Sequence, residues 1–305
     1  MNILTIENLS KSFGDNLVID QMSFSVPKGS IFGFIGKNGS GKTTTMKMIL
    51  GLLKPSRGTI EVCGERVKYG QTDTNRFIGY LPDVPEFYNY MTAYEYLKLC
   101  GEITGLSKKT IKDRSIELLG LVGLDHNNKR IGTFSRGMKQ RLGIAQALLH
   151  EPKLLICDEP TSALDPIGRK EILDILATVR GKTTVIFSTH ILSDVERICD
   201  HIGILHHGKI ILSGTMQEIK KYYHQDSCLI EFSNSHDRDR FLQATTIENL
   251  ESRETTDDVS VILKSQALTR MMQEIMSEMI RLDIVPVKLE ILDPTLENLF
   301  LEVVK

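Results

Sequence analysis

The first 220 residues alternate short apolar runs with segments of helical period. Apolar runs of strand length occupy residues 30–35, 153–157 and 183–189, and helical patterns follow at 42–53, 137–149 and 167–179. Short buried strands that alternate with helices are typical of a parallel α/β sheet. Polar–apolar alternation near the N-terminus and a hairpin around Gly64 add a β-rich flank, and residues 93–124 predict a helical subdomain.

The pattern changes after residue 226. Strand, helix, two strands about an acidic turn, helix and strand follow one another, which is the βαββαβ order of ferredoxin-like domains. We therefore predict two domains, at residues 1–220 and 226–305, the second a small α+β domain. The alternative is an irregular C-terminal tail.

Composition narrows the class of protein. The chain has 305 residues, 41% of them hydrophobic, and a formal net charge of −2. It therefore lacks the excess of positive charge that is typical of nucleic-acid-binding proteins. Five scattered cysteines without metal-binding spacing indicate free thiols in a reducing cytoplasm. The N-terminal segment lacks a signal-peptide layout, and no run of about 18 apolar residues is present to cross a membrane. We expect a cytoplasmic protein with no nucleic-acid partner.

The strongest chemical signal is the segment GKNGSGKT at residues 36–43, between a predicted strand and a predicted helix. This is the context of a phosphate-binding loop, in which glycines let successive backbone N–H groups face a phosphate chain. Lys42 then supplies positive charge to the β and γ phosphates, and the Thr43 hydroxyl binds Mg²⁺. The alternative is a glycine-rich turn with an unrelated lysine. The candidate nucleotide-binding residues are Gly36, Asn38, Gly39, Ser40, Gly41, Lys42, Thr43 and Thr44.

A second signal is LLICDEP at residues 154–160, an apolar strand that ends in two carboxylates. Ligands of parallel α/β sheets bind at this end of the strands. We predict that Asp158 takes part in a Mg²⁺ site. Its neighbour Glu159 points in a different direction and can polarise an attacking water. Taken alone, such a pair is also common as a solvated strand end.

These segments, followed by SALD and STH, occur in an order that resembles the ATP-binding cassette (ABC) ATPases over residues 1–220. The resemblance implies ATP and Mg²⁺ as ligands, with Phe13 stacking on adenine. The alternative for Phe13 is a core phenylalanine. The resemblance also implies that Asp165 couples two nucleotide sites across a dimer and that His190 senses the γ-phosphate beside Glu159.

The segment FSRGM at residues 134–138 stands where the family has its signature Leu-Ser-Gly-Gly-Gln. Ser135 and Gly137 match the signature, and the three other positions depart from it. In the family this helix start closes over the γ-phosphate held by the other subunit, whereas an ordinary capped helix is the alternative. Arg136 opposes the helix dipole, so we expect it to face solvent, a phosphate or an acidic partner.

Asp83 stands where the family usually has a Gln that contacts Mg²⁺ and senses the membrane partner. A carboxylate is also a hard-oxygen ligand for Mg²⁺, but it adds negative charge beside the phosphate. Asp83 is therefore either part of the nucleotide site or a residue with no role in it. The nearby aromatic residues Phe87, Tyr88 and Tyr90 predict either a docking surface for a membrane subunit or local core packing.

The resemblance therefore implies an ATP-hydrolysing subunit that dimerises around two ATP, as a homodimer or with a related ATPase subunit, and drives a separate membrane permease. We expect it on the inner face of the cell membrane, held there by the permease. FSRGMKQRL and DPTLENLFLEVV are similar to bacterial export ATPases for antibiotics, antimicrobial peptides and drugs. One rival is a soluble ABC ATPase acting on nucleic acid or ribosomes, which generally has two joined cassettes or long coiled-coil insertions. The other is a non-hydrolysing nucleotide-gated module, which the presence of Glu159 and His190 disfavours.

Overall fold

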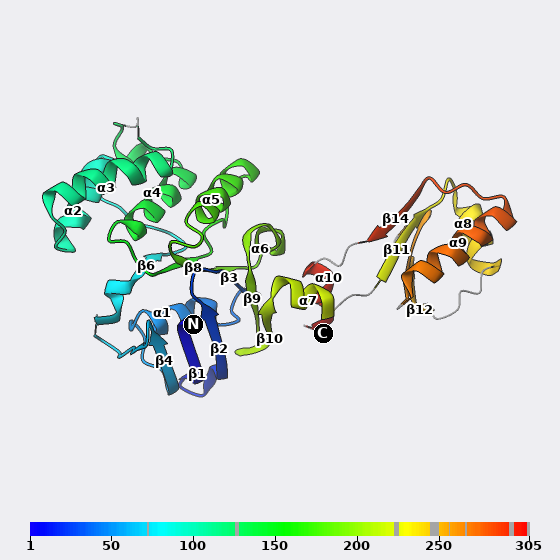
Figure 1. The fold of residues 1–305 in the computed structure, drawn as a ribbon, viewed down its shortest axis with the longest axis horizontal. Helices are drawn as coiled ribbons and strands as arrows, with labels where there is room; N and C mark the ends of the chain where they lie inside the picture. The colour runs from blue at the N-terminus through cyan, green and yellow to red at the C-terminus, as the bar shows by residue number, and fades with distance from the viewer. Residues whose placement is uncertain are drawn as a thin grey trace. The chain divides into compact units, whose positions relative to one another are not determined.

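The computed structural model describes the chain except residues 72, 126–127, 223–225, 245–249, 256, 266, 293–295 and 304–305. It forms two compact units, Met1–Met216 and Gln217–Lys305, which are described separately below (Figure 1). Within the described residues no helix combines the length and the apolar character needed to cross a membrane.

A six-stranded sheet, in the order β10-β9-β3-β8-β7-β6, forms the centre of the first unit. Its strands are β3 (Ile31–Ile35), β6 (Ile78–Leu81), β7 (Leu154–Asp158), β8 (Thr184–Thr189), β9 (His201–His206) and β10 (Lys209–Thr215). All neighbours pair in parallel except β10 with β9. Every residue of β3, β7 and β8 is buried, as expected for parallel strands covered on both faces.

Three helices follow central strands: α1 (Lys42–Ile49) after β3, α5 (Pro166–Thr178) after β7, and α6 (Leu192–Ile198) after β8. Because the strands run parallel, their carboxyl ends meet at one edge of the sheet. The segments that follow β3, β7 and β8 are therefore brought together there, although the first lies more than a hundred residues before the other two in sequence.

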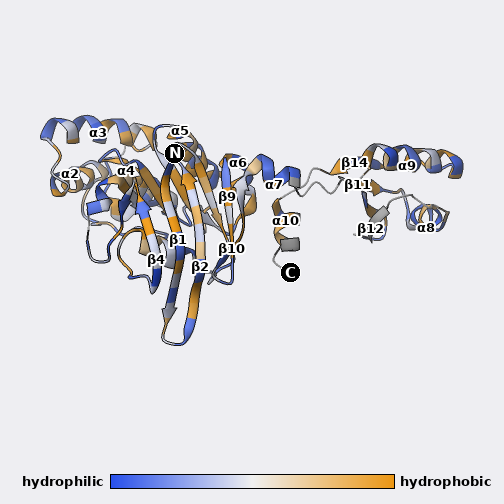
Figure 2. Cartoon of the chain, turned by 60° about the horizontal axis from the view of Figure 1, so that its bottom comes forward, coloured by the Kyte–Doolittle hydropathy of each residue, from blue (hydrophilic) through white to orange (hydrophobic). Residues whose placement is uncertain are grey.

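The predicted β-rich flank is an antiparallel sheet in the order β2-β1-β4-β5. It consists of β1 (Asn2–Phe13), β2 (Asn16–Pro27), β4 (Arg57–Val62) and β5 (Glu65–Arg66). Its inner residues share one core with the parallel sheet, where Phe24 stacks on Phe32 and on Phe34 with 5.5 Å between ring centroids. Figure 2 shows the apolar residues alternating with hydrophilic ones along β1 and β2.

The predicted helical subdomain contains α2 (Ala93–Ile103), α3 (Lys108–Leu121) and α4 (Arg136–Leu148), with short 3₁₀ turns at Asp73–Phe77 and Ile131–Thr133. α2 begins with a capping box, in which Thr92 and Glu95 satisfy each other's backbone N–H groups. α4 packs against β6 and α5, so its N-terminus has a fixed place relative to the central sheet.

The second unit has the predicted βαββαβ order, and the irregular-tail alternative is wrong. After α7 (Met216–Tyr222) come β11 (Asp226–Glu231), α8 (Ser235–Ala244), β12 (Leu250–Thr255), β13 (Ser260–Ser265), α9 (Leu268–Leu282) and β14 (Lys288–Leu292). The four strands form an antiparallel sheet in the order β12-β13-β11-β14. Phe232, Phe241 and Ile275 are central to its core. A further helix, α10 (Leu296–Val303), was not predicted from the sequence.

Candidate nucleotide-binding site

The loop after β3 turns sharply into α1. Gly39 and Gly41 have φ angles of +81° and +109°, in the left-handed region that favours glycine, and a side chain at Gly41 would overlap Ile19. No side chain caps α1, whereas α2, α3, α4 and α5 are capped by Thr92, Ser107, Ser135 and Asp165. The first N–H groups of α1 are therefore arranged to bind an anion.

Lys42 is almost fully buried at the start of α1. Its Nζ donates to the carbonyls of Gly36 at 2.6 Å and Lys37 at 3.3 Å, and lies 3.1 Å from Glu159 Oε1. In the same loop the Ser40 hydroxyl is buried without a hydrogen-bond partner. A concentrated positive charge, a polar group without a partner and an uncapped helix start together fit a phosphate chain.

Asp158 ends β7 and is buried. Its Oδ1 accepts a 2.6 Å hydrogen bond from Ser188 Oγ on β8, and Ser188 Oγ in turn accepts the N–H of Glu159 at 3.0 Å. Ser188 was not predicted from the sequence, although two hydroxyl residues in succession after the apolar run of this strand were a usable signal. Burial, with a smaller contribution from Asp158, raises the pKa of Tyr80 to about 12, and burial also raises the pKa of the Cys157 thiol. Both neighbours of Asp158 therefore stay protonated and neutral.

Glu159 is held in an uncommon conformation at the centre of the site. Its φ angle is +48°, a left-handed conformation that costs a non-glycine residue about 1 kcal/mol. Oε2 lies 2.9 Å from His190 Nδ1, and Oε1 faces Lys42. The carboxylate thus lies between a lysine from α1 and a histidine from the end of β8, and strain of this kind is often found at functional sites.

A cavity of about 370 Å³ opens between these groups. Its lining includes nine of the predicted site residues, namely Asn38, Gly39, Gly41, Lys42, Thr43, Thr44, Asp83, Glu159 and His190. Val18 and Ser162 also line it and were not predicted. The remaining predicted residues lie outside the lining, namely Phe13, Gly36, Ser40, Asp158, Ser135, Gly137 and Asp165.

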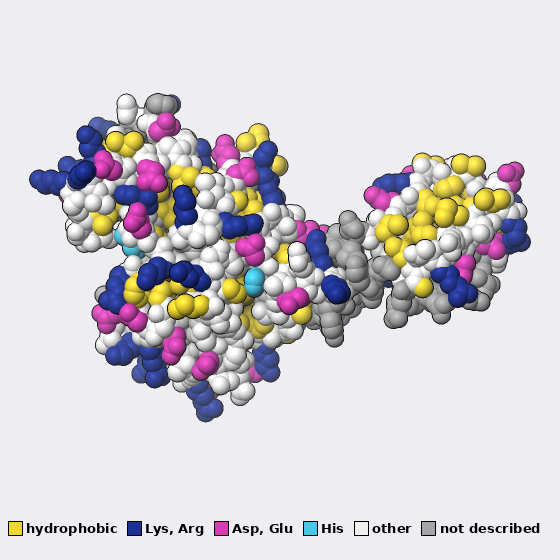
Figure 3. Space-filling model, viewed as in Figure 1, with side chains coloured by type: hydrophobic (Ala, Val, Ile, Leu, Met, Phe, Trp, Pro, Cys, Tyr) yellow, Lys and Arg dark blue, Asp and Glu magenta, His cyan; other side chains and the backbone are white. Residues whose placement is uncertain are grey.

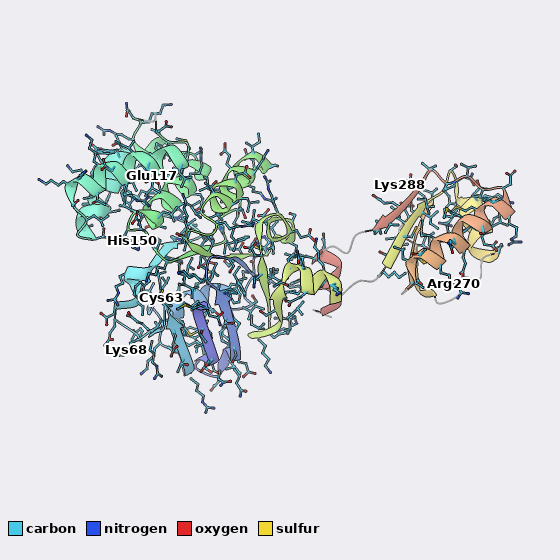
Figure 4. All side chains as sticks on the ribbon, in the orientation of Figure 1. Cys63, Lys68, Glu117, His150, Arg270 and Lys288 are labelled. Atoms are coloured by element: carbon cyan, nitrogen blue, oxygen red, sulfur yellow. The ribbon has the colours of Figure 1, made fainter. Side chains whose placement is uncertain are left out.

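A larger cavity, of about 510 Å³, is lined by residues of α3 and α5 and by the residues that follow α4, and includes Glu117, labelled in Figure 4. It contains none of the predicted phosphate-binding groups. The smaller cavity is therefore the better candidate for the nucleotide.

The N-terminus of α4 is exposed at the surface. Ser135 is the N-cap, and its Oγ accepts the N–H of Met138 at 3.2 Å. A side chain at position Gly137 would touch only Leu164, so the backbone here is open to an approaching group. Arg136 Nη2 lies 3.4 Å from Asp83 Oδ1, with both side chains about half exposed. Of the three environments expected for Arg136, the structure has two, namely solvent and an acidic partner, which the same chain supplies.

Two further predicted residues lie on exposed turns. Phe13 ends β1 and is 50% exposed, which excludes the core-phenylalanine alternative, and Lys11 Nζ lies 4.7 Å from the centroid of its ring. Asp165 caps α5 by accepting the N–H of Gly168 at 2.7 Å. A cap role of this kind stabilises the helix start and leaves the carboxylate at the surface.

Comparison with known proteins identifies the class. The ABC transporter family model matches residues 19–162. The chain is 47% identical over 220 residues to the uncharacterized ABC transporter ATP-binding protein YxlF of Bacillus subtilis, which covers 72% of this chain and 73% of that protein. It is 45% identical over 222 residues to the bacitracin transport ATP-binding protein BcrA of Bacillus licheniformis, with 72% of each chain covered.

A relative that matches nearly the whole chain and a solved structure indicate the same family. The linearmycin resistance ATP-binding protein LnrL of Bacillus subtilis is 35% identical over 98% of this chain and 97% of its own. A solved ATP-binding subunit of an ABC transporter superposes with a TM-score of 0.66 at 35% identity, covering 72% of this chain and 93% of that one. The chain therefore belongs to the ABC transporter ATP-binding family, whose members hydrolyse ATP to power transport, and the resemblance noted in the sequence is confirmed.

Proposed function

We propose that this chain dimerises around two Mg-ATP and drives a separate membrane permease that exports an antibiotic or antimicrobial peptide. In this proposal residues 1–220 carry the ATPase, and residues 226–305 form an accessory domain. The observation that carries the proposal is the position of Glu159 between Lys42 and His190 in a cavity at the carboxyl ends of β3, β7 and β8. The substrate class rests on relatives named for transport of bacitracin and of a lantibiotic, at 45% and 41% identity.

ATP binding rests on the loop of residues 36–44. The backbone N–H groups at the uncapped start of α1 bind the phosphates, and Lys42 neutralises their charge. The half-exposed ring of Phe13 stacks on the adenine.

Mg²⁺ would be held by the Thr43 hydroxyl and, through the buried carboxylate, by Asp158, with Asp83 as a third oxygen donor at the cavity wall. Among the residues that the structure describes, no group of three or more His, Cys, Asp or Glu is arranged to hold a metal. Mg²⁺ in nucleotide sites usually has only one or two protein carboxylates, with substrate phosphates and waters as its other ligands. When bound, the ion neutralises charge on the phosphates.

Hydrolysis follows from the position of Glu159. Water attacks the γ-phosphorus, the bond to the ADP oxygen breaks, and the water proton passes to the Glu159 carboxylate. Ser188 fixes the backbone of Glu159 through its N–H, and His190 holds Oε2. Lys42 and the helix start stabilise the negative charge that the γ-phosphate carries through the transition state.

The aromatic segment beside Asp83 supplies a docking surface for the permease. Tyr88 and Tyr90 are 53% and 64% exposed, while Phe87 packs against Tyr96 with ring centroids 5.0 Å apart. The inner ring thus anchors the segment, and the two tyrosines form an apolar surface with polar tips that suits a helix of a membrane subunit. Through this contact the permease would hold the chain at the inner face of the cell membrane.

Replacement of Asp83 by Gln tests its role as the substitute for the usual glutamine. We expect Asp83→Gln to keep or raise the basal ATPase rate, because it removes negative charge beside the phosphate, and to change the stimulation by the permease. The half-exposed contact with Arg136 contributes little to stability, about 0–1 kcal/mol, so the fold is expected to persist. Glu61→Gln, at an exposed position of β4 outside this segment, is the control. If basal rate and stimulation both stay unchanged, Asp83 has no role in the site.

Removal of the second unit tests whether the first unit folds and binds ATP by itself. A chain that ends at Lys220 is expected to fold and bind ATP, because every proposed nucleotide group lies in the first unit. A ligand that binds only the folded state raises its stability, so Mg-ATP is expected to raise the melting temperature of the shortened chain as it does that of the full chain. A soluble shortened chain without this shift would show that the second unit completes the site.

A further inference from the structure

The sheet of the second unit has an edge formed by β14. In the strand order β12-β13-β11-β14, β14 pairs with β11 and, within the described part of the chain, with no other strand. An open edge exposes backbone N–H and C=O groups that can pair with a further strand, and natural edges are often protected by charged side chains. β14 carries one lysine and one glutamate, two positions apart, and their side chains pair with each other within the strand at 2.6 Å.

The side chains of this strand divide between its two faces. Lys288, labelled in Figure 4, and Glu290 lie on the face away from the helices, and are 49% and 46% exposed. Leu289 packs at the margin of the helix-covered core, and Val287 and Ile291 share its face but are 62% and 52% exposed. One face of the edge therefore carries Val287, Leu289 and Ile291, and the other carries the two charged residues and Leu292.

We propose that the β14 strands of two copies of this chain pair antiparallel about a two-fold axis at Leu289, which joins the two four-stranded sheets into one. In this register Leu289 lies opposite itself. Lys288 lies opposite Glu290 of the second copy, and Val287 lies opposite Ile291 of the second copy. Every cross-strand pair is complementary, as an interface made of the same patch on both subunits requires.

Charge selects this register over its neighbours. An axis at Lys288 would place the two lysines opposite each other, and an axis at Glu290 would do the same with the two glutamates. Like charges directly opposite each other destabilise a strand pair. A shift of one residue on one strand would bring polar side chains onto the apolar face.

The helix layer adds apolar surface to the same contact. A two-fold axis perpendicular to the joined sheet puts the helices of both copies on one side, where α9 packs over β11 next to the edge. Met276, Ile280 and Val285 are 45%, 82% and 80% exposed, and Figure 3 shows hydrophobic side chains gathered over α9 and β14. An exposed apolar patch of this kind marks an interaction surface.

This contact goes beyond the proposed nucleotide-dependent dimer, because it needs no ATP and uses none of the site residues. By holding two chains together, it raises the effective concentration at which their ATPase units meet.

The test measures the oligomeric state of the full chain without nucleotide, in EDTA, by sedimentation over a range of protein concentrations. Wild type is expected to dimerise. Glu290→Lys and Lys288→Glu each place like charges opposite one another and are expected to weaken the dimer about tenfold or more. The double variant Lys288→Glu/Glu290→Lys restores opposite charges and is expected to restore the dimer, and Lys68→Glu in the first unit is the control for charge reversal.

Cross-linking checks the register. Leu289→Cys is expected to form an intermolecular disulfide with itself, whereas Val287→Cys and Ile291→Cys cross-link efficiently only when the two variants are mixed. A monomeric wild type without nucleotide, or a double variant as weak as the single ones, would overturn the proposal. Neither result touches the proposed ATPase. A Glu159→Gln variant, which is expected to bind ATP without hydrolysing it, is then still expected to be trapped as an ATP-bound dimer at high protein concentration.

Discussion

Glu159→Gln is expected to bind Mg-ATP with an affinity close to that of wild type and to hydrolyse it at least about a hundredfold more slowly, the range typical of a positioned general base. The amide keeps the size of the side chain and a hydrogen bond to His190, but it cannot accept the proton of the attacking water. Phosphate release and nucleotide binding, measured on the same preparation, separate the two effects.

Glu151→Gln is the matched control, because Glu151 is also a glutamate with positive φ, at +55°, and lies outside the nucleotide cavity. Its rate is expected to equal that of wild type. A Glu159→Gln protein that hydrolyses ATP near the wild-type rate would contradict the role given to Glu159.

Ser135→Arg is expected to abolish the ATP-trapped dimer that Glu159→Gln forms. Ser135 caps α4 at an exposed site, and it does not line the cavity that contains Lys42 in its own chain. We therefore propose that the Ser135 helix of one chain closes over the phosphates bound at Lys42 of the other chain. An arginine at this position adds bulk and charge to the closing surface. Light scattering with Mg-ATP measures the loss of the dimer.

Tagged mixed dimers decide whether this contact is made in trans. With Lys42→Ala on one chain and Ser135→Arg on the other, the trans arrangement loses one composite site and keeps the second. With both changes on one chain, it loses both sites. A cis arrangement reverses these two results, and equal ATP occlusion in the two mixtures would contradict both arrangements.

The parts of the fold that follow from local sequence were predictable. The apolar runs of β3, β7 and β8 mark buried strands, and the glycines of residues 36–41 mark a tight loop before α1, because both signals lie within a few neighbouring residues. The order of strands and helices in the second unit followed in the same way. α10 was not predicted, because an apolar segment of eight residues fits either a strand or a short helix.

The contacts that build the site depend on strand neighbours, which the sequence alone does not give. Ser188 meets Asp158 only because β8 pairs with β7 in a register that places the two residues side by side. Lys42 reaches Glu159 across the sheet order β3-β8-β7. Arg136 and Asp83 lie 53 residues apart and meet only through the packing of α4 on β6.

The central claim is that the Lys42 loop is the ATP site of this chain. Equilibrium binding of labelled ATP to Glu159→Gln, with and without Lys42→Ala, tests it directly. The account predicts saturation at one ATP per chain in the single variant, and loss of that binding in the double variant, which keeps its melting temperature without nucleotide. Undiminished ATP binding in the double variant would contradict the account.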